Sequence, residues 1–512
     1  MSSSPLLDIP AELSAWVAGH VAKEDLLNFA LTCKTLHNHS QDSLEHQKRC
    51  WALHQVKHDR VPSSIPTLLR LAITNPEAAW HIRILDLWCA HTMPEDWKTW
   101  PFRDFNPTRN DEGEVDPNWP DQTENFTQQI SSFFRSDERR EIRRLMHEHL
   151  HFAPEVTKQC VSGFAEGWDM PMKGLLLALL PRLRSVNFVG ILTIHHLPTK
   201  PWPPGFASLR RVDVGTRTVL RNYTGSHCKP HEVEPLFLLP NLETLNLTRI
   251  SEEDEFNFLD MFGQELDEES EDEAESYLQP RISSITELGL DDCDISLTYL
   301  SRFLSAPARL LKFSIEPRPR ASLASDDLVG YHAHTLVELN APGIEGKYLK
   351  KLKSLTVFDS LCIDTLVVHV GRDGPKSGLK HQSQPRSVQM LDLSVVLSPT
   401  VKKLRLQPGH EWKHGPQPLE QLLSMLADLG DNPQFTGLEE VCMWDLMPLL
   451  EREEVDMVSL DGTFCQAVAR MTARDVALHH DHSEGGEGDF EHRKLHQPLT
   501  GQGVIETDPL RD

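Results

Sequence analysis

A short apolar pattern recurs through most of this 512-residue chain and constrains its fold more than any other feature. The pattern is apolar-x-x-apolar-x-apolar, as in the segment LETLNL at 242–247. From the second copy to the seventh, the spacings are 26, 33, 43, 25 and 26 residues. Such a period is typical of a stacked array, in which each unit buries its apolar face against the next. The ten copies begin at Ile82, Leu183, Leu209, Leu242, Ile285, Leu310, Leu336, Leu352, Val401 and Leu438.

Each copy is expected to form a short strand, and apolar stretches of helical length precede several copies. Alternation along a strand puts Leu245 and Leu247 on one face and Asn246 on the other. The stretch 419–430 carries leucines at helical spacing and ends at Gly430. The repeats resemble leucine-rich repeats. The expected fold class is therefore α/β, with a curved solenoid over residues 81–450 that has parallel strands inside and helices outside.

The outward strand positions of such a solenoid would form a continuous concave surface. Asp86 and Glu440 occupy outward positions of this kind. Repeat arrays use concave faces of this kind as extended binding surfaces. The candidate binding residues on this face are Arg184, Asn187, Arg211, Asp213, Asn246, Asp291, Lys312, Glu338 and Arg405.

Residues 6–50 have a different pattern. Apolar residues at helical spacing predict a first helix after Pro10, a second one capped by Asp25, and a third one after Cys33. The order Ile-Pro-Ala-Glu-Leu at 9–13, Asp-Leu-Leu at 25–27 and Ala-Leu-Thr-Cys at 30–33 resembles the F-box. Residues 51–80 are expected to form linker helices, and together the two regions resemble F-box proteins of filamentous fungi with degenerate repeats.

This resemblance implies a substrate-recognition subunit of a Skp–cullin–F-box ubiquitin ligase. Its partners would be the Skp adaptor, through it the cullin and RING subunits, and an unknown protein substrate. The chain would act by holding the substrate near the ligase, and it would perform no catalysis and need no cofactor. The alternative is a repeat scaffold, adaptor-bound or free, without a role in degradation. The candidate adaptor-binding residues are Ile9, Pro10, Leu13, Val17, Leu26, Leu27, Leu31 and Leu36.

Charge, hydropathy and cysteine content narrow the possible partners and the cellular compartment. The formal net charge is −25, which argues against nucleic acid or an anionic membrane as a partner. The longest apolar runs are far shorter than the roughly 18 residues of a membrane span. Nine cysteines are scattered singly, so reduced thiols and residence in the cytoplasm and/or nucleus are expected.

Several segments are expected to be irregular. Residues 252–275 hold 13 acids and no basic residue, which predicts a solvated insertion between 251 and 276. Segments 101–121 and 371–386 are rich in Pro, Gly, Asn and Asp and predict further insertions. The tail 479–512 is expected to be disordered.

One segment offers an enzymatic alternative. His147, Glu148 and His151 satisfy H-E-x-x-H, which on a helix could hold zinc beside a general base. The segment is highly charged, and Pro154 follows His151 closely. An amphipathic linker helix is therefore the expectation, and a zinc hydrolase is the remote alternative.

Overall fold

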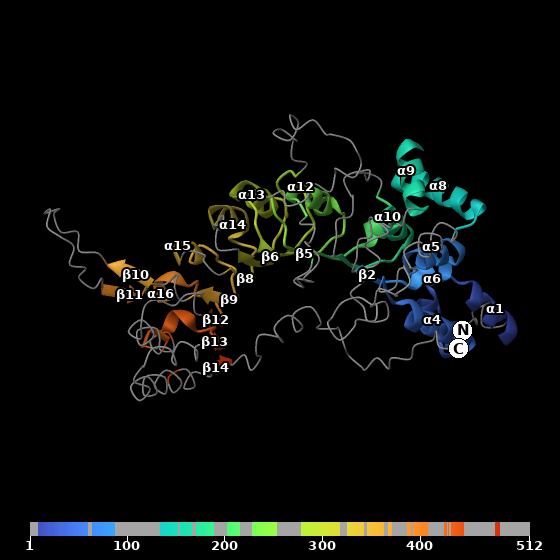
Figure 1. Cartoon of the computed structure of the whole chain (residues 1–512). Coiled ribbons are helices and arrows are strands. Elements are labelled where there is room, and N and C mark those ends of the chain that lie inside the picture. The colour runs from blue at the N-terminus through green and yellow to red at the C-terminus, as the bar shows by residue number, and fades with distance from the viewer. Residues whose placement is uncertain are drawn as a thin grey trace, which may run out of the picture. The chain divides into compact units, whose positions relative to one another are not determined.

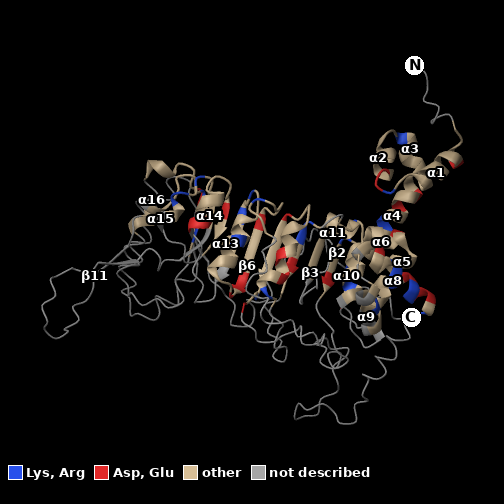
Figure 2. Cartoon of the chain, turned by 90° about the horizontal axis from the view of Figure 1, so that it is seen from above, with Lys and Arg blue, Asp and Glu red and all other residues tan. Residues whose placement is uncertain are grey.

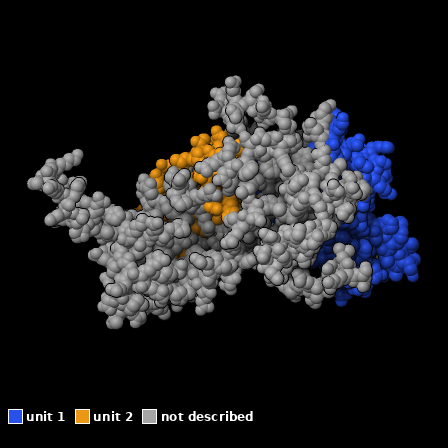
Figure 3. Space-filling model, in the orientation of Figure 1, with its two compact units in different colours: residues 1–214, 232–243 blue, residues 215–231, 244–512 orange. Residues whose placement is uncertain are grey.

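The structure is a computed structural model that divides the chain into two units (Figure 3). Unit 1 comprises residues 1–214 and 232–243, and unit 2 comprises residues 215–231 and 244–512. The residues that the structure describes are 9–59, 64–87, 134–151, 154–165, 170–188, 202–215, 228–252, 278–317, 325–341, 346–362, 367–370, 387–390, 393–407, 424–426, 429, 432–444, 470 and 477–481.

Unit 1 begins with four helices. They are α1 (Ala11–His20), α2 (Leu26–Leu31), α3 (Lys34–His39) and α4 (Gln41–His54). Helices α1 and α2 both pack on α3 (Figure 2). The third predicted helix, expected after Cys33, is the short α3, and the separate helix α4 begins at Gln41. Asp25 is the N-cap residue of α2, as predicted, but its side chain makes no capping hydrogen bond.

The rest of unit 1 is a parallel sheet with packed helices. Its strands pair in the order β1-β2-β3-β4 and are β1 (Val56–His58), β2 (Ile84–Leu87), β3 (Ser185–Phe188) and β4 (Arg211–Val214). The strand β1 was not predicted, so the sheet begins well before residue 81. The helices are α5 (Ser64–Thr74), α6 (Pro76–His81), α8 (Ser136–Leu150), α9 (Pro154–Ala165), α10 (Met170–Leu179), α11 (Pro204–Ser208), α12 (Pro230–Val233), which begins in unit 2, and the 3₁₀ helix η5 (Glu234–Leu238).

Unit 2 continues the same alternation of strands and helices (Figure 1). Its parallel strands pair in the order β5-β6-β7-β8-β9-β12-β13-β14, whereas β10 and β11 form an antiparallel pair. The strands are β5 (Thr244–Thr248), β6 (Glu287–Cys293), β7 (Lys312–Pro317), β8 (Glu338–Asn340), β9 (Val357–Cys362), β10 (Val367–Val370), β11 (Ser387–Met390), β12 (Lys403–Gln407), β13 (Glu440–Trp444) and β14 (Ala477–Asp481). The helices are α13 (Leu297–Ser305), α14 (Ser325–His332), α15 (Gly346–Leu349), α16 (Leu393–Val396) and the 3₁₀ helix η9 (Pro433–Phe435).

The repeats account for both the strands and the core. Nine of the ten predicted copies coincide with a strand, and their inward residues are buried, as Leu245 and Leu247 show at 0% exposure. Each parallel strand therefore hides one face and presents the polar alternate positions on the other. Helices α13 to α16 pack on one another in chain order and form one row in Figure 2. The α/β class with parallel strands is confirmed.

The eighth copy was placed in the wrong register. The strand β9 begins at Val357, and Val357 pairs with Glu338 of β8. The equivalent apolar positions are therefore Leu355 and Phe358, both fully buried, three residues beyond the predicted start at Leu352. The error arose because Leu352, Leu355 and Val357 fill all three apolar positions of the pattern, whereas the observed frame of Leu355 and Phe358 ends in the polar Ser360.

The predicted tail also begins too early. Residues 479–481 belong to β14, which pairs in parallel with β13. The predicted insertions at 101–121 and 371–386, and the acidic run from 253 onward, lie outside the described residues, as do 482–512 and most of the helix expected at 419–430. Within the described part of the chain, no helix has the length and apolar character that a membrane crossing requires.

Two buried polar contacts link elements within the units. In unit 1, Lys173 of α10 and Asp59 after β1 form an ion pair at 3.2 Å, and both side chains are almost completely buried. In unit 2, the ring of His332 is buried in α14 and its Nε2 lies 2.7 Å from the carbonyl oxygen of Leu304 in α13. Burial lowers the pKa of His332, and the hydrogen bond to Leu304 only partly offsets this.

A glycine turn in unit 2 requires its residue type. Gly215 has a φ of +87°, in the left-handed region that side chains with a Cβ disfavour. A Cβ there would also lie 2.1 Å from the backbone oxygen of Thr248. Gly330, in α14, is the opposite case, since nothing lies within 4 Å of a Cβ added to it.

Candidate functional site

The first candidate site is a set of large apolar side chains that α1 and α2 leave exposed. Leu13 and Trp16 of α1 are 53% and 62% exposed, and Leu27 and Leu31 of α2 are 57% and 69% exposed. We call these four residues the exposed apolar set. Of the ten large apolar side chains most exposed among the described residues, seven lie between residues 13 and 56. Such a concentration typically marks a protein-binding surface.

Helices α1 and α2 turn other residues inward, three of which are small. Helix α1 buries Ser14 and Ala18, and α2 buries Leu26 and Ala30. The apolar residues Leu13 and Trp16 therefore do not lie on the buried face of α1.

The eight predicted adaptor-binding residues divide into three groups. Pro10, Leu13, Leu27 and Leu31 are exposed, Ile9 and Val17 are half-buried, and Leu26 and Leu36 are buried at 3% exposure each. The two buried leucines form the interior of the helical module. Trp16 was not among the eight, although it is more exposed than Leu13.

The second candidate site is the outward face of the strands. In unit 1, Asp86, Asn187 and Asp213 are in register on neighbouring strands. Arg211 donates to Asp213 on the same strand, with Nε 2.7 Å from Oδ2. Arg184 lies just before β3 and is exposed.

In unit 2, the outward charges pair across the strands. Lys312 lies 3.5 Å from Glu287 and 3.3 Å from Glu338, which occupy the same register position on β6 and β8. Burial alone would lower the pKa of Lys312, but the two carboxylates raise it overall. Lys403 and Glu440 form a similar pair at 2.8 Å between β12 and β13. Glu287 and Lys403 were not predicted, although both occupy outward positions.

The remaining predicted residues lie separately on this face. Asn246 packs over Gly289 of β6, where an added Cβ would lie 2.4 Å from its Oδ1. Asp291 pairs in register with Thr248, two positions further along the strands. Arg405 is in register with Cys442 of β13. The structure thus links Lys312 with Glu338 and Arg211 with Asp213, but it does not gather the nine predicted residues at one point.

The third candidate site is an open hollow of about 530 Å³ in unit 1, which we call the arginine hollow. Four arginines line it, together with one carboxylate, that of Glu243. Glu243 pairs with Arg210 at 2.6 Å. The lining residues are Arg83, Pro181, Arg182, Arg184, Ala207, Ser208, Arg210, Asn241 and Glu243.

The sheet positions these arginines. The amide of Arg184 donates to the carbonyl of Arg83, and the amide of Arg210 donates to the carbonyl of Arg184, each at 2.8 Å. The three residues therefore form one row, each just before its strand. Arg83 and Arg182 also lie over the ring of Trp80, at 5.2 and 4.1 Å from its centroid.

Burial and the neighbouring positive charges lower the pKa of two of these arginines. Burial, and after it the charges of Arg182 and Arg184, lower the pKa of Arg83 to about 10. The pKa of Arg182 is lowered in the same way, first by burial and then by Arg184. A site of this kind attracts an anion, because guanidinium groups bind carboxylate and phosphate through paired hydrogen bonds. Of its arginines, only Arg184 was predicted.

The alternative zinc site is not assembled. Helix α8 ends at Leu150, and His151 follows it in a left-handed conformation with a φ of 51°. Glu148 forms an ion pair with Arg144 on its own helix. Among the described residues, no metal-ligating group includes His147, Glu148 or His151.

Comparisons with protein families and with curated proteins gave no match. No protein-family model matches the sequence, and no curated protein matches it significantly.

Proposed function

We propose that this chain is the substrate-recognition subunit of a Skp–cullin–F-box ubiquitin ligase. The observation that carries the proposal is the exposed apolar set on α1 and α2, within the segment whose sequence resembles the F-box. Three of the predicted adaptor-binding leucines, Leu13, Leu27 and Leu31, belong to this set. Burying a large apolar side chain contributes about 1.5–3 kcal/mol, so a complex in which an apolar partner surface covers these residues would be stabilised.

The repeat region supplies the other half of the proposal. We infer a curved solenoid of leucine-rich-repeat type, whose outward strand positions hold the target protein. The arginine hollow supports a target with an acidic or otherwise anionic segment, because its lining has three more positive than negative groups. The chain then acts by proximity, in the cytoplasm and/or nucleus, while the Skp adaptor connects it to the cullin and RING subunits.

The first test is co-purification with the Skp adaptor. We expect wild type to form a stoichiometric complex that Leu27→Asp/Leu31→Asp loses. Both positions are more than half exposed in the free chain, so the variant should keep its fold. The matched control is Ile282→Asp, which places the same charge at an apolar position 48% exposed in unit 2.

The outcomes separate the alternatives. Failure of folded wild type to bind would refute the F-box proposal and leave a free repeat scaffold. Adaptor binding without ubiquitination of a captured target would favour an adaptor-bound scaffold. Loss of target ubiquitination in Leu27→Asp/Leu31→Asp, with target binding unchanged, would support the receptor.

A further inference from the structure

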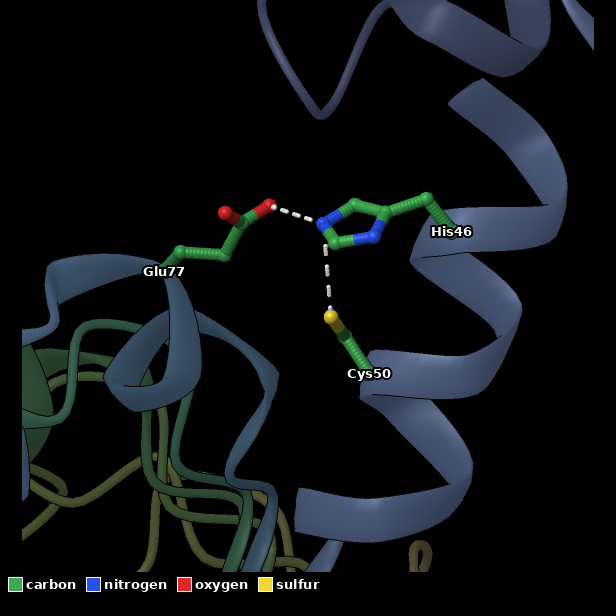
Figure 4. A group of neighbouring side chains, drawn as sticks. All are labelled: His46, Cys50 and Glu77. Carbon is green, nitrogen blue, oxygen red and sulfur yellow. Dashed lines mark hydrogen bonds and ion pairs between the residues drawn. The ribbon is translucent and has the colours of Figure 1, made fainter. Parts of the chain in front are cut away.

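Three potential metal ligands meet where α4 packs against α6. His46 and Cys50 are one turn apart on α4, and Glu77 faces them from α6 (Figure 4). The Nε2 atom of His46 lies 3.5 Å from Oε1 of Glu77 and 3.6 Å from Sγ of Cys50. All three ligand atoms lie within 4.8 Å of one another.

The two separations that involve His46 are those of a tetrahedral zinc site, and the separation between Glu77 and Cys50 is at most 4.8 Å. Bonds of about 2.1 Å to nitrogen or oxygen and about 2.3 Å to sulfur place neighbouring ligand atoms about 3.4–3.6 Å apart. We propose that His46, Cys50 and Glu77 bind one Zn²⁺ ion, with water in the fourth position. The thiolate and imidazole favour zinc over magnesium or calcium, which prefer oxygen ligands throughout.

The surroundings are compatible with a bound cation. Lys23 lies 3.0 Å from Oε1 of Glu77, and its side chain is one-third exposed, so it can move into solvent when a metal takes the carboxylate. His81, one turn beyond Glu77 on α6, is 2% exposed, and neither of its ring nitrogens has a hydrogen-bond partner among the described residues.

A metal ion bound at this site would cross-link α4 and α6 within unit 1. Helix α4 continues from the helices that carry the exposed apolar set, and α6 leads directly into β2. A zinc ion held by both helices would tie the helical module to the start of the repeats. Because zinc binds the folded arrangement, it should also raise thermal stability.

The test uses the purified full-length chain with Zn²⁺ and with Co²⁺ as a spectroscopic probe. We expect one zinc equivalent to bind, measured by competition with a chromogenic chelator. Cys50→Ser and His46→Ala should each weaken this affinity by more than about 100-fold. Cobalt should give a thiolate charge-transfer band that Cys50→Ser abolishes. The matched controls are Cys33→Ser and His37→Ala, which alter the same residue types on α3 or next to it.

The outcomes are decisive in both directions. Loss of the zinc equivalent in both test variants, with retention in both controls, supports the site. The proposal is overturned if wild type binds no zinc, or if Cys50→Ser or His46→Ala binds as wild type does. Zinc should raise the melting temperature of wild type and Cys33→Ser but leave that of Cys50→Ser unchanged, and equal shifts in all three would place the metal elsewhere.

Discussion

The buried ion pair in unit 1 offers the sharpest test of how the sheet is anchored. Lys173 Nζ lies 3.2 Å from Asp59 Oδ2, and the side chains are 2% and 1% exposed. The substitution Lys173→Met keeps most of the apolar stem and removes the charge, so the carboxylate of Asp59 loses this cation while it stays buried. Removing one partner of a buried pair costs about 3–5 kcal/mol, and we expect that loss of stability here.

The assay is amide hydrogen exchange followed by mass spectrometry. Peptides that cover β1 and α10 should report the loss, because both elements touch the pair. At about 1.4 kcal/mol per tenfold change, exchange through global opening should accelerate by roughly two to four orders of magnitude. The matched control is Lys402→Met, because Lys402 pairs with Glu439 at 2.9 Å with both side chains about half exposed. That pair should contribute less than about 1 kcal/mol.

A double variant separates loss of the pair from loss of packing. Asp59→Asn combined with Lys173→Met removes both charges and should recover much of the stability that Lys173→Met alone loses. Exchange within about threefold of wild type in Lys173→Met would refute the reasoning. A double variant no more stable than the single one would show that the cost comes from packing of the lysine stem rather than from charge.

Three further predictions concern pH, backbone and charge. The pKa of His332 is lowered from 6.5 in the folded chain. The neutral ring therefore contributes fully to stability above pH 6.5, and this contribution is lost as the pH falls through the folded-state pKa. The urea midpoint of wild type should fall more steeply with acidification than that of His332→Gln. Gly215→Ala should cost more than about 2 kcal/mol in urea unfolding, whereas Gly330→Ala should stabilise by about 0.5–1 kcal/mol, and equal effects would contradict the assigned backbone conformations. Arg184→Glu/Arg210→Glu should weaken binding of a fluorescent poly-glutamate peptide by at least about tenfold while a poly-lysine peptide gains affinity, and unchanged binding of both would remove the arginine hollow as an anion site.

The strands could be predicted because burial repeats with a fixed period. Nine of the ten copies became a strand in the predicted place. The frame failed at β9, where Leu352, Leu355 and Val357 fill all three apolar positions of the pattern but the observed frame ends in Ser360. Strands β1 and β14 were missed for a different reason. Val-Lys-His and Ala-Leu-His-His-Asp have too few apolar residues, and their pairing with neighbouring strands is what defines them.

In the helical module of α1 to α4, residue type alone does not predict which side chains are exposed. Leu26 and Leu27 are adjacent leucines on α2, yet one is 3% and the other 57% exposed. Successive residues of a helix point about 100° apart, so only one can face the interior of a small module. Which of them does so depends on where α3 packs, and the local pattern does not contain that information.

The arginine hollow could have been found by comparing the repeats at one further position. In most of the repeats the residue directly before the strand bonds through its amide to the equivalent carbonyl of the previous strand, so these residues lie at the same edge of the sheet. In unit 1 this position holds Arg83, Arg184, Arg210 and Glu243 in turn. In unit 2 the described residues at this position are Thr286, Leu311, Val337, Thr356, Lys402 and Glu439. Repetition thus turns scattered arginines into one positive row in unit 1. The described unit 2 positions hold one lysine and one glutamate, so anion binding at this edge is expected of unit 1.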